Sequence, residues 1–332
     1  AYVYRQDGFV FDAGPTIVTA PFLLEELWTL AGRRLADDVE LVPMNPFYRI
    51  RFADGDHFDY SADHAAMRAE VARISPDDLD GYEQFLKASA RVYKVGFQDL
   101  LDVSFESLWT MLKTVPDLVV TQFYRSVHGL VSQYIRHPKL RMVFSFHPLL
   151  VGGNPFTATA VYALIAHLER SHGVHFAMGG TNRLVDGLVR LITRELGGSI
   201  RYNSPVKQIR LADGRACGVE LESGECLDAP VVVSNADAAS TYHRLVPASQ
   251  RKRWSDRRLE RASYSMSLFV WYFGTDIQYP DVLHHMILLG PRYRELLHDI
   301  FSAKVLAEDF SLYLHRPTAT DPSLAPEGCD TF

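Results

Sequence analysis

Three short turns carry the residues whose types and spacing could hold a cofactor. Asp12-Ala13-Gly14-Pro15-Thr16 joins an acidic side chain to a glycine that permits close approach and a proline that fixes the backbone. Such a turn can lie against a planar cofactor, although for residues 12–16 alone an ordinary type II turn is the simpler interpretation. Gly179-Gly180 is a turn before a helix-like repeat, and Asn235-Ala236-Asp237 follows the apolar run at 230–233, where small residues would let a cofactor approach.

The sequence contains no motif that would supply chemistry from side chains alone. No Gly-x-Gly-x-x-Gly, Walker lysine loop or Gly-x-Ser-x-Gly elbow is present, so catalysis would need a bound cofactor. Arg125, His147 and Glu169 lie near apolar runs, and we expect a structural role for each, leaving the catalytic residue unknown. His284 and His285 are adjacent and should point to opposite faces of a strand, so we predict no metal site.

The segment from residue 173 to residue 237 should position these turns. Leucines at helical spacing after Thr181 predict a helix that ends at Gly197-Gly198, with Thr181 as its N-cap. Alternation around Asp213-Gly214 predicts a hairpin, and the run at 230–233 predicts a buried strand. Ligands of open α/β sheets bind beyond the carboxyl ends of such strands, although any α/β protein can contain the same pieces.

The remaining chain alternates strands and helices. We predict strands at 2–4 and 9–18 joined at Asp7-Gly8, a helix at 21–32, two strands joined at Asp54-Gly55, helices from Ser75 to about residue 141, a helix starting at Thr157, and a strand at 264–275.

Length and charge exclude some classes of protein. The chain has 332 residues, enough for two domains, and its net charge of −6 argues against a nucleic-acid partner. No apolar run reaches the roughly 18 residues of a membrane-spanning helix. The chain opens without methionine inside a strand-like pattern, and we therefore expect a fragment.

An apolar helical block covers residues 108–135 and is interrupted by Pro116. An interfacial helix would have this composition, with Lys113, Arg125 and Arg136 at the level of lipid headgroups. An ordinary pair of core helices would have it as well, so both interpretations stay open.

Six segments, taken together and in order, form a recognisable set: FDAGPTI at 11–17, SFHPLLVGGNPF at 145–156, GVHFAMGGT at 173–181, VVSNAD at 232–237, GPRYRELL at 290–297 and EDFSLYLHRPTATDPSLAPEGC at 308–329. They resemble one family, the bacterial-type phytoene desaturases of the flavin amine oxidase and phytoene dehydrogenase superfamily. The resemblance implies an α/β fold, with part of a Rossmann-like FAD-binding domain and an inserted helical and mixed-sheet substrate domain.

The resemblance also implies a division of the chain. Residues 1–20 and 170–245 would belong to the FAD domain, residues 21–169 to a helical substrate and membrane-associating region, and residues 246–332 to the substrate-domain sheet. A family member would also have a glycine-rich dinucleotide motif before this segment and a flavin-contacting motif after it, so we expect the segment alone to be inactive.

The family's cofactor is FAD, and its contacts match single residues here. Gly14, Pro15 and Thr16 match the turn beside the isoalloxazine ring, and Val206 matches the strand that meets the adenine. The full set of matching positions is Gly14, Pro15, Thr16, Gly179, Gly180, Val206, Asn235, Ala236 and Asp237.

The activity implied is desaturation of 15-cis or all-trans phytoene toward neurosporene or lycopene in carotenoid biosynthesis, with hydride transfer to flavin N5. We expect a cytoplasmic protein, peripheral on the inner face of the cell membrane, with oxygen or a quinone as electron acceptor. Two alternatives remain open: a related flavin oxidase of amines, porphyrinogens or retinoids, and a non-enzymatic prenyl-lipid-binding relative.

Overall fold

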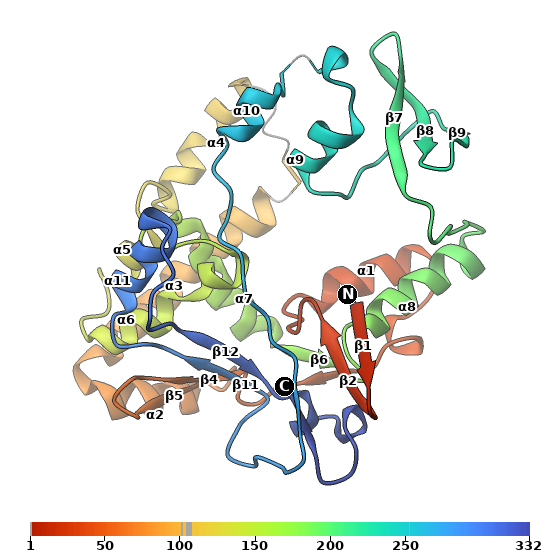
Figure 1. The fold of residues 1–332 in the computed structure, drawn as a ribbon. Helices are drawn as coiled ribbons and strands as arrows, with labels where there is room; N and C mark the ends of the chain where they lie inside the picture. The colour runs from red at the N-terminus through yellow and green to blue at the C-terminus, as the bar shows by residue number, and fades with distance from the viewer. Residues whose placement is uncertain (1, 101, 104–107, 252) are drawn as a thin grey trace. The chain divides into compact units, whose positions relative to one another are not determined.

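The computed structural model describes residues 2–100, 102, 103, 108–251 and 253–332, and the chain folds as two compact units (Figure 1). Unit 1 contains Ala1–Leu191 and Met266–Phe332, and unit 2 contains Ile192–Ser265. Unit 1 is therefore built from two separate stretches of chain. These units do not follow the division predicted from the sequence, which stays a prediction.

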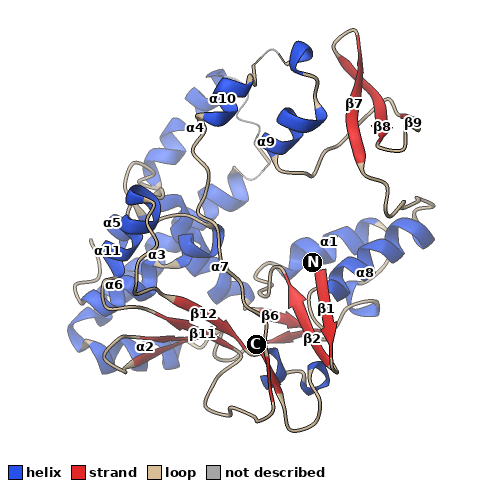
Figure 2. Ribbon diagram, viewed as in Figure 1, coloured by secondary structure: helices blue, strands red, loops and turns tan. Residues whose placement is uncertain are grey.

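A four-stranded mixed sheet forms the centre of unit 1, in the order β12-β11-β4-β5 (Figure 2). The β4–β5 hairpin turns at Gly55, whose φ of +89° favours glycine, which confirms the turn predicted there. Strand β11 runs parallel to β4 and antiparallel to β12. The strands are β4 Tyr48–Arg51, β5 His57–Tyr60, β11 His285–Leu288 and β12 Leu312–His315.

Helices bury the main core of unit 1 against this sheet. Its largest fully buried side chains are aromatic, and they include Tyr48, Phe58, Phe85, Phe144 and Phe146. Burial of one such ring stabilises the fold by about 1.5–3 kcal/mol. These helices are α2 His64–Ile74, α3 Leu79–Tyr93, α5 Val127–Val131, α6 Pro138–Ser145, α7 Leu164–His172 and α11 Tyr293–His298. A further helix of unit 1, α4 Leu108–Val120, contributes no described residue to this core.

The start of α3 contacts the loop before α6. Asp78 is buried, and its two carboxylate oxygens accept hydrogen bonds from the backbone amides of Arg136 and His137, both at 2.8 Å. A Cβ on Gly81 would lie 1.9 Å from the carbonyl oxygen of Tyr134, so only glycine fits there. The start of α3 is thus held to the loop before α6 by the Asp78 hydrogen bonds and by the close backbone contact of Gly81 with Tyr134.

The other strands of unit 1 form short antiparallel pairs. The β1–β2 hairpin turns at Asp7 and Gly8, with φ of 51° and 83°, as the sequence predicts. The ring of Trp28 on α1 packs in a second small core beneath α8 and donates a hydrogen bond of 2.8 Å to Asp38. The elements are β1 Tyr2–Gln6, β2 Phe9–Ala13, α1 Pro21–Leu30, β3 Leu41–Pro43, β6 His175–Ala177, α8 Asn182–Arg190, β10 Gly274–Thr275 and β13 Asp330–Thr331.

Unit 2 contains a three-stranded antiparallel sheet in the order β7-β8-β9. The first hairpin turns at Asp213 and Gly214, both with positive φ, which confirms that prediction. Gly218 has a φ of +144°, and its missing Cβ would lie 2.1 Å from the carbonyl oxygen of Leu227. The elements are β7 Val206–Ala212, β8 Arg215–Leu221, β9 Cys226–Asp228, α9 Ala238–Ser240 and α10 Asp256–Glu260.

Two predicted strands are wrong. Residues 230–233 form no strand, and Val231 and Val233 are 73% and 87% exposed. Of the predicted strand at 264–275 only Gly274–Thr275 forms a strand, next to Phe273, which exchanges two backbone hydrogen bonds with Phe332, and Phe269 is 94% exposed. Apolar β-branched and aromatic residues become a strand only when a neighbouring strand takes their backbone hydrogen bonds, and in the described structure no strand pairs with residues 230–233 or 264–272.

The helix predicted to start at Thr157 begins later. Thr159 is the N-cap of a 3-10 turn, Ala160–Ala163, that leads into α7, and its hydroxyl accepts the amide of Val161 at 3.4 Å. Because Thr157 and Ala158 donate their amides to the carbonyl of Asn154, the chain is still in a turn at residue 157.

His128 in α5 should make the fold sensitive to acid. Its ring lies 4.5 Å from the ring of Phe156, and burial, aided by the charges of Arg294 and Arg141, lowers its pKa to about 4. An unfolded histidine takes up a proton near pH 6.5, so stability falls as the pH drops from about 6.5 to 4, by at most about 1.4 kcal/mol per pH unit. Urea midpoints across this range should fall less steeply in His128→Gln, whereas the exposed control His298→Gln should match the unaltered protein.

Candidate functional site

The turn after β2 presents bare backbone at the surface of unit 1. Gly14 and Pro15 are exposed, and Gly14 has a φ of +142°, which disfavours any residue with a Cβ. Thr16 is anchored, because its hydroxyl shares a hydrogen bond of 2.7 Å with the phenol of Tyr313 on β12. The turn is therefore held at one end and open at the other, as a surface for a planar ring requires.

Asp12 joins this turn to the start of α8. The carboxylate is buried, and Oδ2 accepts hydrogen bonds from the amide of Thr181 at 2.5 Å and from its hydroxyl at 2.7 Å. A Cβ on Gly180 would lie 2.9 Å from the Asp12 carboxyl carbon, so glycine is needed for this approach. Thr181 does precede α8, as predicted, but its hydroxyl bonds to Asp12 and does not cap the helix.

The amides of the Gly179-Gly180 turn are satisfied within the chain. Gly179 donates to Asp321 Oδ2 at 2.7 Å, and Gly180 donates to the carbonyl of Ala177 at 2.9 Å. These residues therefore shape the turn with their positive φ angles. Asp321 is a residue that the sequence did not single out, since its partner lies 142 positions earlier.

The other four predicted residues lie in unit 2. Val206 begins β7, an edge strand of its sheet that pairs with β8 alone in the described structure. Asn235 and Ala236 lie in an exposed loop, and the Asp237 carboxylate caps α9 by accepting the amide of Ser240 at 2.8 Å. The cofactor assignment of all nine residues stays a prediction.

A second group of polar side chains is fully buried in the main core. The hydroxyl of Tyr48 donates to Glu169 Oε2 at 2.5 Å, and His147 Nε2 lies 3.3 Å from the same oxygen. Burial, together with the charge of Glu169, raises the pKa of Tyr48 well above its usual value. His147 is a core histidine, as predicted, whereas Arg125 is exposed and lies over the Tyr124 ring.

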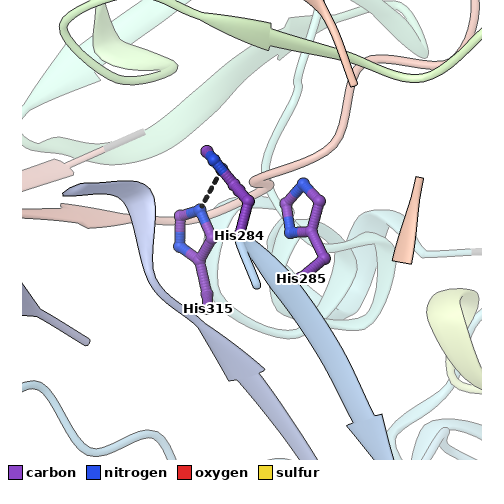
Figure 3. A group of neighbouring side chains, drawn as sticks. All are labelled: His284, His285 and His315. Carbon is purple, nitrogen blue, oxygen red and sulfur yellow. Dashed lines mark hydrogen bonds between the residues drawn. The ribbon is translucent and has the colours of Figure 1, made fainter. Parts of the chain in front are cut away.

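Three histidines gather where β11 begins and β12 ends (Figure 3). The ring centroids of His284 and His285 are 4.3 Å apart, and the His284 and His315 Nε2 atoms are 3.1 Å apart. The prediction that the first two rings point to opposite faces is therefore wrong, and the prediction that they bind no metal ion together stays a prediction. Since β11 begins at His285, His284 precedes the strand and is not bound by its alternation.

Hydrogen bonds hold two of these rings in place. Thr320 Oγ1 lies 2.5 Å from His284 Nδ1, and the phenol of Tyr313 lies 2.7 Å from His285 Nδ1. The same phenol meets Thr16, so the histidines are connected to the predicted flavin turn. Sequence reasoning missed Tyr313 and His315, and only the pairing of β11 with β12 would have revealed them.

Comparison with known proteins identifies one matching family, and the similar proteins described here are phytoene desaturases. Residues 1–308 match the family described as flavin-containing amine oxidoreductase. The chain is 47% identical to the neurosporene-forming phytoene desaturase of Cereibacter sphaeroides over 98% of its length, and 48% identical to the lycopene-forming phytoene desaturase of Pseudescherichia vulneris over 100%. It spans 64% and 67% of the length of these two relatives.

More distant matches define the limits of the similarity. The 4,4'-diapophytoene desaturase of a Methylomonas species is 34% identical over 98% of this chain and 63% of its own length. A solved protein from Pyrococcus furiosus covers 99% of this chain and 68% of its own, with a TM-score of 0.62 and 17% identity, which supports the fold alone. The predicted α/β fold of the amine oxidase type is confirmed.

Proposed function

The chain belongs to the family of flavin-containing amine oxidoreductases, and from this membership we propose that the protein is an FAD-dependent phytoene desaturase of carotenoid biosynthesis. The observation that carries the proposal is identity of 44–48% to phytoene desaturases across 98–100% of the chain. Relatives that form neurosporene and lycopene are equally similar, so the proposal covers both products.

The residues of the Gly14 turn fit a flavin. Gly14 offers backbone without a side chain, Pro15 is exposed beside it, and Thr16 fixes the turn to Tyr313. We infer that this turn would hold the isoalloxazine, and that the main chain at Val206, where β7 begins, would meet the adenine. When bound, FAD supplies the acceptor of the hydride.

The substrate class follows from chemistry and from the relatives. Phytoene is a hydrocarbon, so it offers no hydrogen-bonding group and can be held only by apolar burial and shape. The role of the chain would then be to align a carbon–hydrogen bond and exclude water. Identity of 47–48% to phytoene desaturases against 34% to the diapophytoene enzyme favours the longer phytoene over diapophytoene.

A test of the function uses full-length protein purified with its flavin. Phytoene in liposomes should bleach the flavin absorption under anaerobic conditions as a more unsaturated polyene forms, and a quinone or oxygen, which is itself reduced, should then restore the absorption. Bleaching by amines and not by phytoene would favour an amine oxidase. A colourless protein that binds prenyl lipids would contradict the enzyme proposal.

Replacement of Gly14 by valine should weaken flavin binding. A side chain would occupy the surface where the ring is proposed to lie, so we expect the dissociation constant of FAD to rise at least about tenfold, equivalent to about 1.4 kcal/mol. The matched control is Gly55→Val, a turn glycine with φ of +89° and nothing within 4 Å of its Cβ position, which carries similar backbone strain. Equal flavin retention in both variants would refute the assignment.

We further propose that α4 rests on the cytoplasmic face of the cell membrane, from which phytoene and a quinone would enter. Leu112, Val115 and Val119 recur on one face of the helix and are 62%, 42% and 49% exposed. Tyr124 and Arg125 follow, a pair suited to the headgroup layer. The described helices include none long and apolar enough to cross a membrane. The side chain of Lys113, also predicted at this surface, is outside the described part.

Charge on this face should release the protein from lipid. In Leu112→Glu/Val119→Glu we expect binding to phosphatidylglycerol vesicles to fall about tenfold or more, because two apolar contacts become two carboxylates facing an anionic surface. Leu306→Glu is the control, since Leu306 is 96% exposed outside α4. Unchanged sedimentation of the double variant with vesicles would contradict the proposal.

A further inference from the structure

The histidine group at β11 and β12 has the dimensions of a metal site. Two nitrogen ligands at about 2.0–2.1 Å from a tetrahedral ion are separated by roughly 3.4 Å. His284 Nε2 and His315 Nε2 are 3.1 Å apart, and the ligand atoms of all three histidines lie within 4.8 Å of one another. A rotation of the His285 side chain that brings a ring nitrogen closer to the other two would complete a three-nitrogen set.

One nitrogen of the group is buried with no partner. His285 is 1% exposed, and its Nε2 makes no hydrogen bond in the described structure. A buried polar atom left unpaired costs about 1–3 kcal/mol. A metal ion among the three rings would satisfy it, whereas the hydrogen bond between His284 and His315 satisfies only those two.

The surroundings orient the rings as metal ligands. The Nδ1 atoms of His284 and His285 are engaged by Thr320 and Tyr313, so Nε2 is the nitrogen of each ring that remains for a metal ion. Metal-binding histidines nearly always have such a partner on the second nitrogen, and it fixes the tautomer. Thr320 and Tyr313 are such partners for His284 and His285.

The charge state also suits coordination. Burial lowers the pKa of His284 to about 4 and that of His285 well below its ordinary value, so both rings are neutral at neutral pH. The charge of Arg316 adds to the lowering of the His284 pKa, and its guanidinium is paired with Asp330 at 3.0 Å. Neutral imidazoles favour zinc and its neighbours over magnesium or calcium, which prefer oxygen.

We propose that His284, His285 and His315 bind a divalent first-row transition-metal ion, for which Zn²⁺ is the probe, with water as a fourth ligand. The ion would fasten the start of β11 to the end of β12. This inference rests on the histidine geometry and does not depend on the proposed desaturase activity.

The test is zinc uptake by full-length protein with its flavin, after treatment with a chelator. Equilibrium dialysis should show one tight site per chain, and zinc should raise the thermal midpoint whereas magnesium should not. His285→Gln and His315→Gln should each weaken binding at least about tenfold. The control His298→Gln, at an exposed histidine of α11, should bind like the unaltered protein.

A second variant keeps the proposal testable if a histidine variant fails to fold. Tyr313→Phe retains all three rings and removes only the hydrogen bond to His285 Nδ1, so zinc binding should weaken about 10–100-fold with the circular dichroism spectrum unchanged. No zinc uptake by the unaltered protein, or equal affinity in it and all of these variants, would overturn the proposal.

Discussion

Replacing Glu169 by alanine is expected to lower the free energy of unfolding by about 3–5 kcal/mol. The carboxylate is fully buried and accepts the hydroxyl of Tyr48 at 2.5 Å, with His147 at 3.3 Å. Alanine would leave that hydroxyl and the imidazole without this acceptor and would open a void in a close-packed core. No solvent reaches the site to compensate.

Two controls separate charge from shape. Glu169→Gln keeps the volume and one acceptor oxygen for Tyr48, so we expect a loss of only about 1–2 kcal/mol. Glu26→Ala, at an exposed position of α1, should change stability by less than about 0.5 kcal/mol. Urea unfolding followed by near-UV circular dichroism measures all three, and a loss below about 1 kcal/mol in Glu169→Ala would show that the buried group contributes little.

Asp78→Ala should be nearly as damaging, with an expected loss of about 3–5 kcal/mol. Each of its hydrogen bonds joins a charged oxygen to a backbone amide, at Arg136 and His137, and such bonds contribute about 1.5–3 kcal/mol apiece. The change would leave two amides unpaired at the junction of α3 and α6. The close fit of Gly81 against Tyr134 allows little movement to find new partners.

The neighbouring aspartate is the matched control for this prediction. Asp77 is exposed and precedes the same helix, so Asp77→Ala should have little effect in the same urea experiment. Asp78→Asn retains one acceptor oxygen and should lose about half as much as Asp78→Ala. If the Asp77 and Asp78 variants lost equal stability, helix-end charge and not the paired amides would be responsible.

Local signals predicted the parts of this fold that depend on a few adjacent residues. The turns at Asp7-Gly8 and Asp213-Gly214 require positive φ at two successive positions, and the sequence offers residues that tolerate it. Helix α1 begins at Pro21, because proline is favoured in the first turn of a helix. These features need no information from elsewhere in the chain.

Features that depend on distant partners could not be read in this way. The apolar run at 230–233 looks like a buried strand, yet a strand exists only where another pairs with it, and Val233 is 87% exposed. The histidine group was missed because alternation was applied to His284, one residue before β11 begins. Asp321 and Tyr313, which secure the predicted cofactor turns, act from the far end of the sequence.

The bond between Thr16 and Tyr313 joins residues 297 positions apart, and Gly179 meets Asp321 across 142. During synthesis on the ribosome, both turns must therefore wait for the last strands of unit 1, while the hairpin of unit 2 can close soon after it emerges. Closing such long loops costs entropy before any contact repays it, which makes assembly of these turns a late event in folding. A chain stalled before residue 313 would carry its helices and its β7–β8 hairpin but would lack the anchor beneath Gly14.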